Sequence, residues 1–154
     1  MDFRGYRDSS NNFVNNCLNF INMSDINTSA ITDMSYMFQN LTQLKGINAD
    51  FDTSNVTTFK YMFSGCKELT SLDLRRFITT ACTDTLAMFR NCTNLETLDL
   101  RNFDISKVTS FSNMFLHCPL RHITCTAAFR KWCNTNQTAL GITNYNNIKW
   151  TIIL

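Results

Sequence analysis

The chain contains little that would divide it into domains or place it in a membrane. It has one proline and four glycines in 154 residues, and no run of Gly, Ser or Pro that would act as a linker. No apolar segment approaches the ~20 residues that span a bilayer. Residues 1–8 lack the apolar stretch of a secretory signal. We therefore expect one domain, residues 1–154, without membrane insertion and without an export signal.

An excess of charge of one sign is also missing. The formal net charge is +2, and the basic residues are scattered along the sequence. A protein that binds nucleic acid needs a concentrated basic surface to neutralise phosphates. We therefore expect no nucleic-acid partner.

What the chain does contain is a repeat. The dipeptide Met-Phe returns at steps of 25, 26 and 26 residues, as Met37-Phe38, Met62-Phe63, Met88-Phe89 and Met114-Phe115. A period in the twenties is typical of a strand-bearing unit that buries its apolar face only by stacking on its neighbours. We predict an α/β repeat fold, a short solenoid with a parallel sheet on one side and short helices on the other.

The strand half of each repeat is clearest in one copy, where Leu69, Leu72 and Leu74 follow the pattern LxxLxL. Side chains alternate between the two faces of a strand, so Leu72 and Leu74 are predicted to point inward. Ser71, Asp73 and Arg75 then point outward. The matching outward residues of the next copy are Thr97, Asp99 and Arg101.

The other half of each repeat has helical spacing, because Phe59, Met62 and Phe63 stand at i, i+3 and i+4. A threonine precedes each predicted helix and is expected to be its N-cap. These threonines are Thr32, Thr57, Thr83 and Thr109. Two residues after each Phe stands a residue type that tolerates the left-handed conformation at a helix end. These residues are Asn40, Gly65, Asn91 and His117.

The seven cysteines contain no CxxC pair, and most of them share a phase with apolar residues of other copies. Cys66, Cys92 and Cys118 share one phase with Leu41, and Cys125 aligns with leucines. Cysteines stacked at equivalent positions have nearly parallel Cβ vectors, which suit a disulfide poorly. We predict buried, reduced thiols that act as small apolar residues, and no metal site.

The repeat becomes irregular at both ends of the chain, as expected of capping segments. We assign residues 1–17 to an N-terminal cap, 18–125 to the repeats and 126–154 to a C-terminal cap. Thr126 is expected to cap a helix that runs through Trp132. The alternating Trp150, Ile152 and Leu154 predict a closing strand. An uncovered strand edge at that end would be a template for pairing with another chain.

The repeats resemble a known family. Residues 51–57 are FDTSNVT and residues 61–63 are YMF, followed by Cys66 and by LDL at residues 72–74. A similar motif, FDISKVT, recurs at residues 103–109. This pattern resembles the BspA-type leucine-rich repeat. The resemblance implies a right-handed solenoid of the kind found in surface proteins of bacteria and protists and in proteins encoded by gut phages, which typically bind other macromolecules.

From the resemblance, which covers residues 18–125, we expect a non-enzymatic module for macromolecular binding or adhesion. Many bacterial members are exported and anchored, whereas this sequence shows no export signal, lipid-attachment cysteine or wall anchor. The alternative is therefore a structural or decoration component of a virion or another large assembly. The sequence favours a virion-associated or cytoplasmic location over Sec-dependent export.

Catalytic candidates are few. His117 and His122 flank Cys118 closely enough to suggest a Cys/His nucleophile or a metal site, but the repeat phase places Cys118 inward. Asp73 and Asp99 are predicted to form a solvated charge network with Arg75 and Arg101. We expect no catalytic residue and no cofactor.

The candidate binding surface is the exposed face of the sheet, and the expected partner is a protein. Outward residues of a repeat sheet are free of packing constraints and can contact a partner. The candidate binding residues are Asn48, Asp50, Asp73, Arg75, Arg76, Asp99, Arg101 and His122. A second contact is expected along the closing strand, through Trp150, Ile152 and Leu154. A merely solvated sheet face remains the alternative interpretation.

Overall fold

The computed structural model describes residues 19–50 and 52–153, and shows an α/β protein with parallel sheets and few helices. The predicted N-terminal cap, Leu18 and Leu154 lie outside the described residues. Within the described residues the strands form two sheets, one with the order β1-β2 and one with the order β3-β4-β5-β6. The elements are β1 (Phe20–Asn22), β2 (Gly46–Asn48), β3 (Ser71–Asp73), β4 (Thr97–Asp99), β5 (His122–Thr126), α1 (Ala127–Thr135), α2 (Gln137–Leu140), the 3-10 helix η1 (Tyr145–Asn147) and β6 (Lys149–Ile153).

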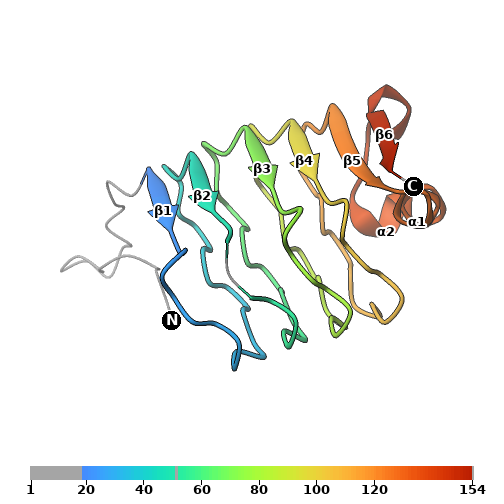
Figure 1. Cartoon of the computed structure of the whole chain (residues 1–154). Helices are drawn as coiled ribbons and strands as arrows, with labels where there is room; N and C mark the ends of the chain where they lie inside the picture. Colours follow the sequence, from blue (N-terminus) through green and yellow to red (C-terminus); the bar gives the residue numbers. More distant parts are fainter. Residues whose placement is uncertain (1–18, 51, 154) are drawn as a thin grey trace.

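The strand register confirms the repeat period. Ile21 pairs with Ile47, Leu72 pairs with Leu98, and Leu98 pairs with Ile123, all in parallel. Strands β1 to β5 lie side by side along the molecule, and each of β1 to β4 is followed by a long excursion to the opposite side (Figure 1). Equivalent residues of successive repeats therefore become neighbours in space.

The predicted alternation along the strands is also confirmed. Leu72, Leu98 and Ile123 are buried, whereas Ser71 and Asp73 on either side of Leu72 are exposed. A strand that is half buried needs this pattern, because one face packs on the core and the other meets water. The strands before β5 are only three residues long. Arg75 and Arg101 consequently lie in the turns after β3 and β4 and not on the strands.

The Met-Phe repeat builds a column of stacked rings through the core. Phe38, Phe63, Phe89 and Phe115 are at most 1% exposed. Consecutive ring centroids lie 5.3, 5.8 and 5.7 Å apart, with interplanar angles of 21°, 2° and 1°. Each ring thus fills the space between its two neighbours, and the column ties the repeats together.

The prediction of a short helix in each repeat is wrong. The segments between the strands of successive repeats are turns. The amides of Tyr61 and Phe63 donate across to the carbonyls of Leu86 and Met88 in the next repeat, both at 2.9 Å. A helix would direct these same amides along its own axis. Stacked neighbours offer backbone acceptors at the right spacing, so the bonds that would have formed a helix run between repeats.

The amides that lie between those crossing to the next repeat close local turns. These turns explain why some residues have positive φ angles. The amide of Met62 donates to the carbonyl of Phe59 at 3.0 Å, and that of Cys66 donates to Phe63 at 3.1 Å. The third residues of these two turns, Tyr61 and Gly65, have φ of 55° and 79°, as a type II turn requires. The left-handed conformation predicted for one residue per repeat is confirmed at Asn40, Gly65, Asn91 and His117. The second left-handed position was not predicted, and it holds Tyr36, Tyr61, Ala87 and Asn113.

The threonines predicted as N-caps serve a different purpose, since no helix follows them. The hydroxyls of Thr57 and Thr83 donate to the main-chain oxygens of Thr32 and Thr57, at 3.0 and 3.2 Å. Each therefore bonds to the preceding repeat and not to a helix end. Other threonines, Thr28, Thr53 and Thr79, are 1% exposed and donate to carbonyls of the following repeat.

The C-terminal end matches its prediction more closely. Thr126 caps α1 by accepting a hydrogen bond from the amide of Phe129 at 3.2 Å, and the helix continues past Trp132 to Thr135. The closing strand is β6, which pairs in parallel with β5. In Figure 1 the two helices and β6 occupy the C-terminal end of the molecule.

The prediction of buried, reduced thiols is confirmed for the six cysteines that the structure describes, all of which are buried and free. The Cys66, Cys92 and Cys118 thiols donate to the carbonyls of Phe38, Phe63 and Phe89 at 3.1, 3.0 and 2.8 Å. Burial raises the pKa of Cys66 well above its usual range. The Cys66 thiol therefore stays protonated, and all three side chains extend the apolar interior.

Candidate functional site

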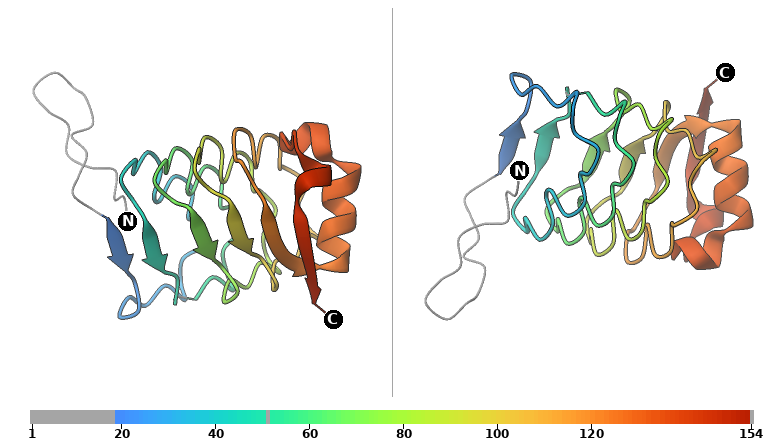
Figure 2. Two further views of the ribbon diagram at one scale, coloured as in Figure 1. Left: turned by 90° about the horizontal axis from the view of Figure 1, so that it is seen from above. Right: turned by 90° about the horizontal axis from the view of Figure 1, so that it is seen from below.

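Five of the eight predicted binding residues gather around one hollow. The hollow has a volume of about 200 Å³ and lies at the carboxyl ends of β2 and β3. Its polar lining consists of Asn48, Asp50, Asp73, Arg75 and Arg76. In the left view of Figure 2, no helix lies over β1 to β4 on the side that faces the viewer. The exposed side of the strands therefore ends here, where the two sheets adjoin, in a polar, mixed-charge rim.

The charges around this rim are paired in two different ways. Arg75 Nε lies 3.0 Å from Asp73 Oδ2 within one repeat, whereas Arg76 Nη1 lies 2.5 Å from Asp50 Oδ1 of the preceding repeat. The main-chain amide of Arg75 also donates to Asp73 Oδ1 at 3.0 Å. These side chains are exposed, so each pair contributes at most about 1 kcal/mol to stability. Their arrangement is therefore only weakly held.

The remaining predicted residues lie outside the hollow. Arg101 Nε donates to both carboxylate oxygens of Asp99, at 3.0 and 3.1 Å. Burial opposes ionisation of Asp99, but the hydrogen bonds and charge of Arg101 outweigh it and lower the pKa of the carboxyl. His122, on β5, shares a hydrogen bond of 2.8 Å with the hydroxyl of Thr151 on β6. In the predicted charge network, each arginine pairs directly with the aspartate of its own repeat. The charge of Arg75 also acts on Asp99, and that of Asp73 acts on Arg101.

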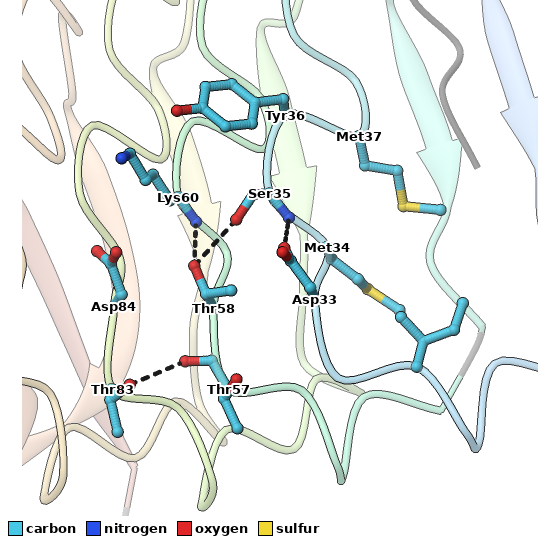
Figure 3. Close-up of a pocket in the computed structure, with 11 residues that line it drawn as sticks. Asp33, Met34, Ser35, Tyr36, Met37, Thr57, Thr58, Lys60, Thr83 and Asp84 are labelled. Atoms are coloured by element: carbon cyan, nitrogen blue, oxygen red, sulfur yellow. Dashed lines mark hydrogen bonds between the residues drawn. The ribbon is translucent and has the colours of Figure 1, made fainter.

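A second hollow, on the opposite side of the repeats, was not predicted. It has a volume of about 710 Å³ and is lined by residues of the turn segments, among them Asp33, Thr58, Lys60 and Asp84 (Figure 3). Tyr36 borders it and stacks on Tyr61, with ring centroids 5.3 Å apart. The signal was in the sequence, because the two tyrosines stand 25 residues apart at one phase of the repeat.

Lys60 adds a cation to this tyrosine pair. Its Nζ lies 5.9 Å from the ring centroids of both Tyr36 and Tyr61. Ser35 and Thr58 both line the hollow, and their hydroxyls lie 3.1 Å apart (Figure 3). The hollow thus combines aromatic, hydroxyl and charged groups, and none of these residues was among the predicted site residues.

The histidines considered for catalysis are not brought into one site. His117 Nδ1 shares a hydrogen bond of 2.7 Å with Asn91 Oδ1, and Cys118 points its thiol to the carbonyl of Phe89. Among residues 19–50 and 52–153, no group of three or more His, Cys, Asp or Glu side chains is placed to hold a metal ion. In the same residues, no helix is both long enough and apolar enough to cross a bilayer.

Comparison with known proteins identifies the family. The chain matches the family described as "Mycoplasma protein of unknown function, DUF285" over residues 8–129. The match spans most of the chain, and the protein belongs to this family. No curated protein and no solved structure matches the chain.

Proposed function

We propose that the protein is a BspA-like leucine-rich-repeat solenoid that binds another protein through the exposed face of its sheet. The parallel register at steps of 25 or 26 residues, the phenylalanine column and the coil-like path of the chain support the solenoid. Its right-handed sense and its BspA type rest on the sequence resemblance. In this proposal the chain binds and does not catalyse.

One observation carries the binding function: the uncovered side of the strands ends in a row of Asp–Arg pairs that solvent reaches. Asp73 and Arg75 of one repeat and Asp99 and Arg101 of the next present the same pairing side by side. The first pair is exposed and the second is partly exposed. Repeated charges of this kind at the surface fit a polar contact with a protein. Arginine is favoured in such contacts because its planar group donates several hydrogen bonds.

The test is the double substitution Arg75→Ala and Arg101→Ala. Because both side chains are outside the core, the variant should keep the melting temperature of the parent to within a few degrees. It should lose capture of partners that the parent selects from an array of purified proteins. The matched control is Lys67→Ala with Lys107→Ala, which removes two exposed cations elsewhere. Equal capture by all three chains would remove this face from consideration.

A second candidate function is a structural role in a larger assembly, such as a virion. The observation that favours it is the position of β6 at the end of the strand order, with β5 as its neighbour. A strand at a sheet edge is a template for a further strand. Size-exclusion chromatography with light scattering separates the candidates, since a discrete oligomer favours assembly and a monomer favours reversible binding. Turnover that is lost on substituting His117 or His122 would contradict both.

A further inference from the structure

The carboxyl-terminal third of the sequence contains no acidic residue. All 12 Asp and Glu residues lie at or before Asp104, whereas basic residues continue to Lys149. The later basic residues are Lys107, Arg121, Arg130, Lys131 and Lys149. The net charge of the whole chain is small, but its C-terminal end is basic. This end comprises β5, α1, α2 and β6.

Three cations of the C-terminal elements form no ion pair with any residue that the structure describes. In the preceding repeats Arg75, Arg76 and Arg101 each hold an aspartate, and Arg121 reaches Glu96 at 3.2 Å. In the part of the chain that the structure describes, no ion pair joins a carboxylate to the later cations. Those cations are Arg130, Lys131 and Lys149. They are all exposed and are free to meet an external anion.

Two of them line a groove between α1 and β6. Ala127, Arg130, Lys131 and Asn134 stand at i, i+3, i+4 and i+7, and so share one face of α1. With Tyr145 and with Ile152 of β6, they enclose a hollow of about 400 Å³. Figure 2 shows α1 and β6 together at the end of the molecule. The groove is basic on its helix side and partly apolar on its strand side.

The strand beside the groove has an open edge. The amide of Lys149 donates to the carbonyl of Arg121 at 2.7 Å, so the backbone of Lys149 faces β5. In a parallel ladder the backbone groups of alternate residues face opposite ways. The amides and carbonyls of Trp150 and Ile152 therefore face away from β5. A strand of a partner could form its backbone hydrogen bonds with these outward-facing amides and carbonyls.

We propose that the groove between α1 and β6 binds an extended, acidic segment of a partner protein. The segment adds a strand to β6 and lays Asp or Glu side chains on Arg130 and Lys131, while an apolar side chain contacts Ile152 and Tyr145. Nucleic acid or an anionic membrane would use the cations but would leave the strand edge unpaired. The inference rests on the second proposed function and specifies the chemistry of its partner.

The test uses a labelled ten-residue peptide that alternates Glu with Val or Thr, and measures Kd by fluorescence anisotropy. Because two charge-assisted contacts are removed, Arg130→Gln with Lys131→Gln should weaken binding roughly tenfold. The control Lys67→Gln with Lys107→Gln changes the net charge equally and should leave Kd within about twofold. Absence of binding to the parent chain, or equal weakening in both variants, would overturn the proposal.

A second comparison tests strand addition separately from charge. A peptide of the same sequence, N-methylated at alternate residues, keeps its carboxylates but loses half of its backbone donors. It should bind roughly tenfold more weakly. The substitution Ile152→Pro should have a similar effect while far-ultraviolet circular dichroism stays unchanged, because the amide it removes faces away from β5. Equal binding of the methylated peptide would overturn the proposal, as would tighter binding of an oligonucleotide or of phosphatidylserine vesicles.

The sheet-face variant distinguishes this inference from the first proposed function. Arg75→Ala with Arg101→Ala leaves the groove intact, so its Kd for the peptide should equal that of the parent. Loss of peptide binding in this variant would place the contact on the sheet face and would overturn the groove proposal. If this variant no longer captures partners from the protein array but still binds the peptide, the sheet face and the groove are each supported as a separate binding surface.

Discussion

The strand side and the turn side of the repeats are both held by parallel hydrogen bonds between neighbours, but they use the backbone differently. On the strand side Leu72 and Leu98 pair in extended conformation. On the turn side only alternate amides cross to the next repeat, and the others close local turns around residues such as Tyr61 and Gly65 with positive φ. The same stacking thus supports one regular and one irregular ladder.

The difference shows that an apolar pattern determines burial more strongly than it determines hydrogen-bond partners. Phe59, Met62 and Phe63 have the spacing of one helix face, and all three are fully buried. They reach the interior from a series of turns. A helix would satisfy the same amides locally, but the neighbouring repeats satisfy them across the stack and also bring the rings into register.

The largest effect is expected from breaking the ring column on the turn side. Phe89→Ala removes a fully buried ring that stacks on Phe63 and Phe115, and should cost about 4 kcal/mol of unfolding free energy. Leu98→Ala on the strand side should cost about 3 kcal/mol. Urea unfolding of both variants tests the order. A larger loss for Leu98→Ala would show that the strand side contributes more.

The turn geometry itself is tested at Gly65. Its φ is 79°, and an added Cβ would clash with Asn40 Oδ1. Gly65→Ala should therefore destabilise the protein by about 2 kcal/mol. Asn91 occupies the equivalent position with φ of 60°, and Asn91→Gly should change stability by less than about 0.5 kcal/mol. Thermal melting of both variants checks this, and equal losses would contradict the role of the left-handed turn.

The corner between the two sides is tested at its threonines. The Thr53 hydroxyl is buried, donates to the carbonyl of Ile78 at 3.0 Å and accepts from its amide at 2.8 Å. Thr53→Val should cost about 1 to 2 kcal/mol, because two buried groups lose their partner. Thr57→Val should cost less than about 0.5 kcal/mol, since water replaces the exposed hydroxyl. Similar losses in denaturant unfolding would argue against this distinction.

The smallest effect is expected from the charges on the strand side. The pKa of Asp99 is lowered in the folded protein, so the Asp99–Arg101 pair stabilises the fold above the unfolded pKa of about 3.9 and loses this contribution as pH falls through the folded pKa. Asp99→Asn should cost less than about 1 kcal/mol at pH 7, because the pair is partly exposed. Urea unfolding should show a difference in stability between the parent and Asp99→Asn at pH 7 that becomes smaller at pH 3. A difference that persists at pH 3 would contradict this assignment.

The candidate site was predictable to the extent that it follows the repeat. Outward positions such as Asp73 and Asp99 could be read from strand alternation, and the structure pairs them as neighbours. The ion pair between Arg76 and Asp50 could not be predicted from the sequence, because it depends on the path of two turns. The basic groove was missed because Arg130 and Ile152 are far apart in sequence and meet only when β6 returns beside α1.

The sequence by itself determined the period, the inward side chains, the buried thiols and one left-handed residue per repeat, because burial and backbone tolerance are properties of the residues themselves. Only the tertiary structure decided where the backbone amides of the Met-Phe segments bond. A chain of i, i+3 and i+4 apolar residues is compatible with a helix or with stacked turns, and the choice depends on acceptors supplied by the neighbouring repeat.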